Sequence, residues 1–141
     1  MNVNLKFDQI HVGQTANLIE KFSTKDLDTF INLSGDNSSI HFSKDDAIKK
    51  GFNNRVIHGA MIISKISKLI GTVLPGDSAL LLSLEFDFQK PLYPEQLFEI
   101  TSKVSEKHSS VNCISIKFKV SLRDDSTKIA KGSALVNINY D

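Results

Sequence analysis

The stretch that decides the fold runs from Gly59 to Val73 and reads GAMIISKISKLIGTV. Its apolar residues fall at positions 62, 63, 66, 69, 70 and 73, a spacing typical of a helix whose broad apolar face is buried. Leu74-Pro75-Gly76 follows and ends the helix, because proline cannot continue it. Lys65 and Lys68 interrupt the stretch, which is too short to span a bilayer comfortably. We therefore expect a buried core helix in a soluble, cytoplasmic protein.

Downstream of this helix the hydrophobic period changes from helical to alternating. Apolar and polar residues alternate in 80–88, 96–106, 112–122 and 128–140, which predicts half-buried antiparallel strands. Arg123–Ser126 is typical of a hairpin connection. The small residues Ala130, Gly132 and Ala134 would leave room for the helix on one face of the sheet. We therefore predict an α+β fold, an antiparallel sheet wrapped around one long central helix, as a single domain over residues 1–141.

Upstream, two start signals bracket a polar loop. Residues 15–22 are predicted as a short strand, and the capping box of Ser23-Thr24-Lys25-Asp26 opens a helix that ends at Gly35. A second start at Ser43 predicts a short helix through Lys50. Residues 36–42 are therefore expected to form a loop between two helices, where reactive side chains are often displayed.

Composition limits the function classes. The chain has 141 residues, 40% hydrophobic and 23% charged, as expected for one globular domain with a core. A formal net charge of +1 argues against a broad nucleic-acid-binding surface. Cys113 is the single cysteine, which excludes an internal disulfide and a cysteine-based zinc site. Residues 1–15 contain no sustained apolar stretch typical of a secretory signal.

The polar loop carries the candidate chemistry. Asp36 and His41 place a carboxylate and an imidazole five positions apart, and His58-Gly59 stands where the long helix begins. A carboxylate and an imidazole can move a proton, and the free N–H groups of a helix start can stabilise an oxyanion. Asp36 alone would equally suit a turn after Gly35, and His58 suits a structural hydrogen bond that fixes the loop.

These residues resemble the MaoC-like hydratases, which have the hot-dog fold. The family motif, roughly Gly-Asp-x-Asn-Pro-x-His, corresponds to residues 35–41, and an apolar-His-Gly segment corresponds to residues 56–59. Leu74-Pro75-Gly76 and residues 86–91 also fit, so that the resemblance extends from about Phe7 to Ile138. Ser38 and Ser39 replace the usual Asn and Pro, which is expected to soften the loop.

The resemblance implies reversible hydration of trans-2-enoyl thioesters to (R)-3-hydroxyacyl thioesters, with Asp36 and His41 as the catalytic pair. It also implies that the Gly59 N–H stabilises the oxyanion and that the Ser67 hydroxyl supports Asp36 from behind, a supporting place we also expect for His58. We expect no metal and no cofactor, a substrate carried on CoA or on the phosphopantetheine of an acyl-carrier protein, and no nucleic-acid or membrane partner. An exposed sheet edge would favour a homodimer.

Two other functions are compatible with the same fold. A hot-dog thioesterase commonly places its carboxylate in the central helix, and the absence of Asp and Glu from residues 59–73 counts against it. A non-catalytic subunit that holds acyl thioesters is the second alternative, kept open by Ser38 and Ser39.

Overall fold

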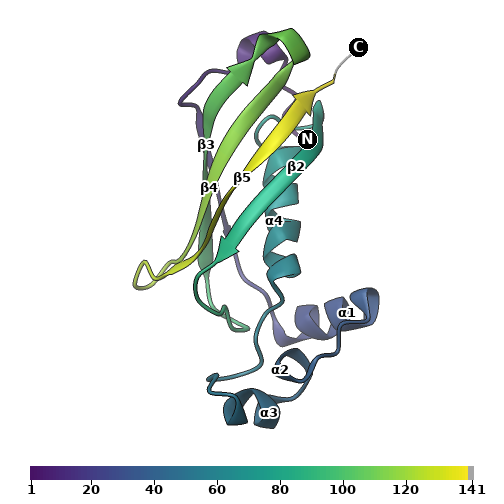
Figure 1. Cartoon of the computed structure of the whole chain (residues 1–141), viewed down its shortest axis with the longest axis vertical. Coiled ribbons are helices and arrows are strands. Elements are labelled where there is room, and N and C mark those ends of the chain that lie inside the picture. The colour runs from purple at the N-terminus through teal and green to yellow at the C-terminus, as the bar shows by residue number, and fades with distance from the viewer. Residues whose placement is uncertain (140–141) are drawn as a thin grey trace.

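Helix α4 (Gly59–Thr72) lies along one face of a five-stranded antiparallel sheet in the computed structural model, which describes residues 1–139 (Figure 1). The strand order is β1-β3-β4-β5-β2. The strands are β1 (Thr15–Glu20), β2 (Ala79–Phe88), β3 (Phe98–His108), β4 (Cys113–Leu122) and β5 (Lys128–Ile138). This is the hot-dog arrangement, so the predicted fold class is confirmed. The last predicted strand ends at Ile138, and position 140 lies outside the described residues.

The core forms between α4 and the facing side of the sheet. Ile62, Ile66 and Leu69 of α4 are buried against the alternating inward residues of the strands. On β4 these inward residues are Ile114, Ile116, Phe118 and Val120, each at most 2% exposed. Burying one such side chain contributes roughly 1.5–3 kcal/mol, so this interface dominates the stability of the fold.

Strand β2, and not helix α4, fills the space beside Gly132. We predicted that the helix would occupy the space left by Gly132. In the structure Phe86 of β2 lies opposite this glycine and occupies that space. A Cβ on Gly132 would lie 2.5 Å from the Phe86 ring and 2.1 Å from the backbone oxygen of Glu85. β2 is also an edge strand with a register shift after Leu81, and it leaves Leu80, Leu81 and Leu82 exposed.

Three short helices gather beyond the N-terminal end of α4 (Figure 1). In α1 (Thr24–Ser34) the Ser23 side chain accepts from the backbone N–H of Asp26, and Gly35 ends the helix with a positive φ of 75°, both as predicted. Helix α3 (Lys44–Lys49) begins after Ser43, also as predicted. The segment predicted as a loop contains one helical turn, α2 (Ser39–Phe42), so His41 stands on a helix and not in a loop.

Two 3₁₀ turns, η1 (Phe7–Gln9) and η2 (Ser109–Val111), complete the secondary structure of the described residues. None of the helices within residues 1–139 has both the length and the apolar character that crossing a membrane requires.

Candidate active site

The imidazole of His41 is fixed by the segment that precedes α4. Its Nδ1 lies 2.6 Å from the backbone oxygen of Val56, and a carbonyl can only accept, so Nδ1 carries the proton. The backbone N–H of Val56 donates in return to Ile40, at 2.9 Å. The Nε of Arg55 donates to the backbone oxygen of His41, and its guanidinium also binds Asp28 of α1. In the neutral ring, Nε2 of His41 therefore holds a free lone pair, the form that a general base needs.

His58 is a buried companion of this ring. It is 3% exposed, and its ring stacks on that of His41 with centroids 3.7 Å apart and planes 19° from parallel. Its Nε2 donates to the backbone oxygen of Asp36 at 3.0 Å, while Nδ1 has no partner within residues 1–139. Burial lowers the pKa of His58, because the charged imidazolium would lose its hydration in the interior. His58 is therefore held as the neutral Nε2–H tautomer, as suits a supporting residue.

The Asp36 carboxylate is exposed and oriented by its own turn. Its Oδ1 accepts from the Ser38 hydroxyl at 2.6 Å and from the Ser38 backbone N–H at 3.2 Å. These two bonds, the hydroxyl first, lower the pKa of Asp36. The other oxygen, Oδ2, lies 3.8 Å from Nε2 of His58. Ser38 was expected to soften this loop, yet in the structure its side chain and backbone both hold the carboxylate.

Asp36, His41 and His58 thus meet at one point, and each offers one atom within 4.8 Å of the others. Such a set could in principle ligate a metal, which needs nitrogens about 2.0–2.1 Å away and in the plane of each ring. Two stacked rings cannot direct in-plane lone pairs at one ion unless they separate. The arrangement favours proton transfer, and the absence of a metal remains a prediction.

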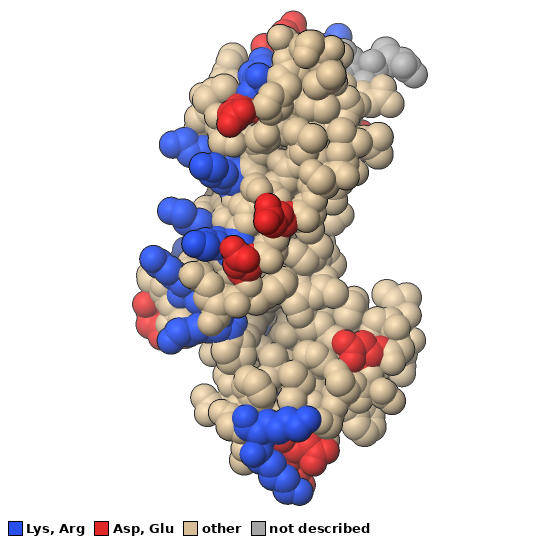
Figure 2. All heavy atoms as spheres, viewed as in Figure 1, with Lys and Arg blue, Asp and Glu red and all other residues tan. Residues whose placement is uncertain are grey.

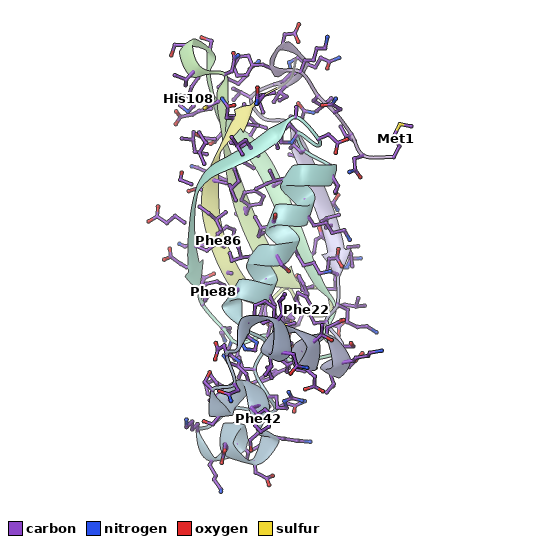
Figure 3. All side chains as sticks on the ribbon, turned by 90° about the vertical axis from the view of Figure 1, so that its right-hand side faces the viewer. Met1, Phe22, Phe42, Phe86, Phe88 and His108 are labelled. Carbon is purple, nitrogen blue, oxygen red and sulfur yellow. The ribbon has the colours of Figure 1, made fainter. Side chains whose placement is uncertain are left out.

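A pocket of about 350 Å³ begins beside His41 and reaches the first residue of α4. Gly59 borders it, together with apolar walls from Val56, Ile57, Ile62, Phe88 and Leu92. The first N–H groups of a helix have no partner within the helix, and the helix dipole makes them favourable to negative charge. Phe88 lies close by: a Cβ on Gly59 would be 2.9 Å from the tip of its ring (Figure 3). Asp36 does not line this pocket, but its carboxylate lies beside His41, which does.

The structure does not bring Ser67 to this site. Ser67 is exposed on α4 and makes no hydrogen bond to Asp36 among the described residues. Lys65 and Lys68, on the same stretch of helix, both pair with Glu20. Sequence reasoning missed two supporting residues, Ser38 and Arg55. Ser38 could have been found as a hydroxyl two positions after an aspartate, a common local turn, whereas nothing in the sequence pointed to Arg55.

Comparisons with known proteins agree with this geometry. Residues 8–125 match the model of the MaoC like domain. The chain is 32% identical over 102 residues to a 3-hydroxybutyryl-CoA dehydratase of Methylorubrum extorquens, covering 72% of this chain and 65% of that protein. It is 34% identical over 86 residues to an (R)-specific enoyl-CoA hydratase of Rhodospirillum rubrum, covering 61% and 60%. The matched segments therefore span somewhat less than two thirds of these curated relatives.

The same relationship is seen among solved structures. The unliganded R-hydratase PhaJ1 of Pseudomonas aeruginosa superposes with a TM-score of 0.90 at 25% sequence identity, covering 100% of this chain and 90% of that one. Three observations indicate the same family. They are the hot-dog sheet around α4, the carboxylate and imidazole near the start of that helix, and the family match over most of the sequence. The chain belongs to the MaoC-like domain family.

Proposed function

We propose that this chain catalyses the reversible addition of water to trans-2-enoyl thioesters, giving (R)-3-hydroxyacyl thioesters, with neither a metal nor a cofactor. The observation that carries the proposal is the meeting of Asp36, His41 and His58 within 4.8 Å beside a largely apolar pocket at the start of α4. The names of the relatives, an enoyl-CoA hydratase and a 3-hydroxybutyryl-CoA dehydratase, support the same reaction in its two directions.

The fixed tautomer of His41 suggests how the two catalytic groups divide the work. Since Nδ1 holds its proton against Val56, Nε2 is free to take a proton from water. The bonds from Ser38 lower the pKa of Asp36, so its carboxylate is a poor proton acceptor. His41 is therefore the base, while ionised Asp36 orients the water and stabilises the imidazolium.

The step balances with one water molecule. Nε2 of His41 takes one proton from the water as the water oxygen bonds to C3 of the enoyl group. The π bond between C2 and C3 breaks, and its electrons form an enolate with the negative charge on the thioester oxygen. The proton first held by Nε2 of His41 is then delivered to C2, which restores the thioester and the free base. Dehydration follows the same path in reverse.

The developing oxyanion would lie against the start of α4. The N–H of Gly59 points out of the helix there, and the absence of a side chain lets the thioester approach the backbone. One such donor is worth about 10²–10³ in kcat. His58 supports the site in two ways. Its Nε2 donates to the backbone oxygen of Asp36, and its ring stacks on the ring of His41.

The substrate carrier would be CoA or the phosphopantetheine of an acyl-carrier protein, and we place the enzyme in the cytoplasm as a homodimer. Support for the dimer comes from edge strand β2, where Leu80, Leu81 and Leu82 are exposed and the strand has a free edge. A second copy pairing there would extend the sheet and cover these leucines.

The proposal is tested with Asp36→Asn and His41→Ala, assayed by the loss of crotonyl-thioester absorbance. Each change should lower kcat/KM by about 10²–10⁴, because His41→Ala removes the base and Asp36→Asn removes the charge that stabilises its protonated form. His11→Ala is the matched control, since His11 is exposed and remote from the pocket, and it should retain full activity. Wild-type activity in either site variant would remove that residue from the mechanism.

The same preparation separates the alternatives. Helix α4, where a hot-dog thioesterase commonly places its carboxylate, contains no Asp or Glu, so release of free thiol from saturated acyl thioesters should be negligible. Rapid thiol release would identify a thioesterase. Tight acyl-thioester binding with no turnover in either direction would instead identify a non-catalytic subunit.

A further inference from the structure

The outer face of the sheet, turned away from α4, carries a patch of four lysines. Lys103 of β3, Lys117 and Lys119 of β4, and Lys131 of β5 are all exposed, and each follows or precedes a buried residue of the inner face. Figure 2 shows basic side chains gathered along this side of the molecule, beside the strands. We call these four residues the lysine patch.

Strand register arranges the patch in two neighbouring rows across the sheet. In order from β1 to β2, the first row is Asn17, Thr101, Lys119, Lys131 and Asp87, and the second is Thr15, Lys103, Lys117, Ser133 and Glu85. Each row contains two lysines directly opposite one another and ends on a carboxylate at β2. Since strands are about 4.8 Å apart and alternate residues about 7 Å apart, the four lysines stand as a tight group.

The outer face of a half-buried sheet is polar, but this alone does not require lysines to stand opposite lysines. Like charges directly opposite one another in a sheet are destabilising. The ion pairs within residues 1–139 include none of the four lysines, although Asp87 stands across from Lys131. A bound anion would relieve both repulsive pairs at once.

The patch lines a hollow of about 810 Å³, which also includes the hydroxyl residues Thr101 and Ser133 and the acidic residues Glu85 and Asp87. The aromatic residue of its lining, Phe118, is 2% exposed and offers no platform on which the successive bases of a strand could stack. Together with a net charge of only +1, this argues against a nucleic acid strand and for a small ligand that carries its charge on a few phosphates.

We propose that this hollow binds a nucleotide, with two phosphates on the lysine patch and the ribose hydroxyls on Glu85 and Asp87. Ammonium groups bind phosphate oxygens through charge-assisted hydrogen bonds. A carboxylate is a common acceptor for ribose hydroxyls, and here Glu85 and Asp87 lie two strand spacings, roughly 10 Å, from Lys117 and Lys119 in their rows. The charge order across the sheet, positive at the centre and negative at the β2 edge, matches a nucleotide from phosphate to sugar.

The nucleotide has two possible sources. One is a free nucleoside diphosphate, and the other is the nucleotide end of a CoA thioester, which rests on the proposed function. Asp87 faces the hollow and the next residue, Phe88, faces the pocket beside Gly59, so the two cavities lie on opposite faces of one strand.

The first test is calorimetric titration of the full chain with ADP, adenosine 3′,5′-bisphosphate and inorganic pyrophosphate. Saturable binding that weakens as salt is added is expected. Lys119→Gln/Lys131→Gln should weaken it by at least about tenfold, since two phosphate contacts are lost. The matched control, Lys25→Gln/Lys44→Gln, removes the same charge from exposed positions on or beside α1 and α3 and should leave affinity within about twofold. No saturable binding at millimolar nucleotide, or an equal loss in the control, overturns the proposal.

A second double variant tests the contacts to the ribose. Glu85→Gln/Asp87→Asn should weaken ADP while pyrophosphate affinity stays equal or rises, because only ADP carries the ribose. Equal strengthening of both ligands would show that these carboxylates merely repel anions, and it would overturn the nucleotide assignment.

Kinetics then separates the two sources. If the nucleotide belongs to CoA, Lys119→Gln/Lys131→Gln raises KM for a CoA thioester and leaves KM for a truncated thioester without a nucleotide unchanged. Unchanged KM for both, with ADP binding lost, identifies a free nucleotide. Binding is measured without turnover, so an inactive chain would refute the proposed function and leave this site to be judged by the titrations.

Discussion

Gly59→Ala separates two reasons for a glycine at the start of α4. The added methyl would lie 2.9 Å from Cζ of Phe88 and 3.1 and 3.2 Å from the adjoining ring atoms. These atoms are the far end of a side chain that is 51% exposed, so a small rotation of the ring should make room. Alanine also favours a helix over glycine by up to about 1 kcal/mol. The free energy of unfolding should therefore change by less than about 1 kcal/mol, and the melting temperature by less than about 5 °C.

Activity should respond far more strongly. The methyl would stand beside the N–H that is proposed to receive the thioester oxygen, and it would keep that oxygen from hydrogen-bonding distance. Losing one oxyanion donor costs about 10²–10³ in kcat, equivalent to about 2.7–4 kcal/mol. We expect a loss of this order in crotonyl-thioester hydration, followed by absorbance, with thermal unfolding followed by circular dichroism on the same samples.

The double variant Gly59→Ala/Phe88→Ala decides why the glycine is there. With the ring removed, the methyl has space on the Phe88 side. If the glycine serves the substrate, Gly59→Ala still costs about 10²–10³ in the Phe88→Ala background. If the loss disappears in that background, the glycine is needed only because the Phe88 ring packs against it, and the oxyanion assignment is refuted. Undiminished activity in Gly59→Ala alone would refute it as well.

Three further results are expected. Ser38→Ala removes a bond that lowers the pKa of Asp36, so this pKa should rise, while Ser38→Thr keeps the wild-type value. Titration of the Asp36 carboxyl followed by NMR measures it, and an unmoved pKa in Ser38→Ala would contradict the role of this bond. The lowered pKa of His58 means that the unfolded chain takes up a proton at about pH 6.5 that the folded chain resists, so wild-type stability should fall as pH drops below this value. Urea unfolding at pH 7.5 and 5.5 measures this fall, and a fall of equal size in His58→Gln would show that His58 is not its source. Light scattering should give a dimer for the wild type and a monomer for Leu82→Lys, which charges the exposed edge of β2; a wild-type monomer at micromolar concentration would remove the dimer.

Much of the architecture could be predicted because its signals are local. The Ser23–Asp26 capping box and Gly35 bound α1 because each works through hydrogen bonds or backbone angles within a few residues. The alternation in β4 identified both its inner and outer faces for the same reason. The single turn of α2 was missed, because four residues form too short a helix for any period to show.

The site was predicted less completely, because side-chain direction and contacts between distant segments decide it. Ser67 is eight residues beyond Gly59 and one beyond the buried Ile66, and each residue rotates the helix by roughly 100°, which carries Ser67 out of the buried face. The stacking of His41 on His58 depends on two bonds that join α2 to Val56, one from the His41 ring to the Val56 oxygen and one from the Val56 N–H to the Ile40 oxygen. No spacing in the sequence reveals this pairing.

Arg55 has a consequence of its own for how variants of this protein should be read. Its guanidinium ties α1 to the carbonyl of His41, and its side chain is only 14% exposed, yet it lies outside the pocket lining. A change there would release the base from its place while the central helix and sheet remained intact. In a random mutagenesis screen, Arg55 would therefore be grouped with the reacting residues by its phenotype, although it never meets the substrate.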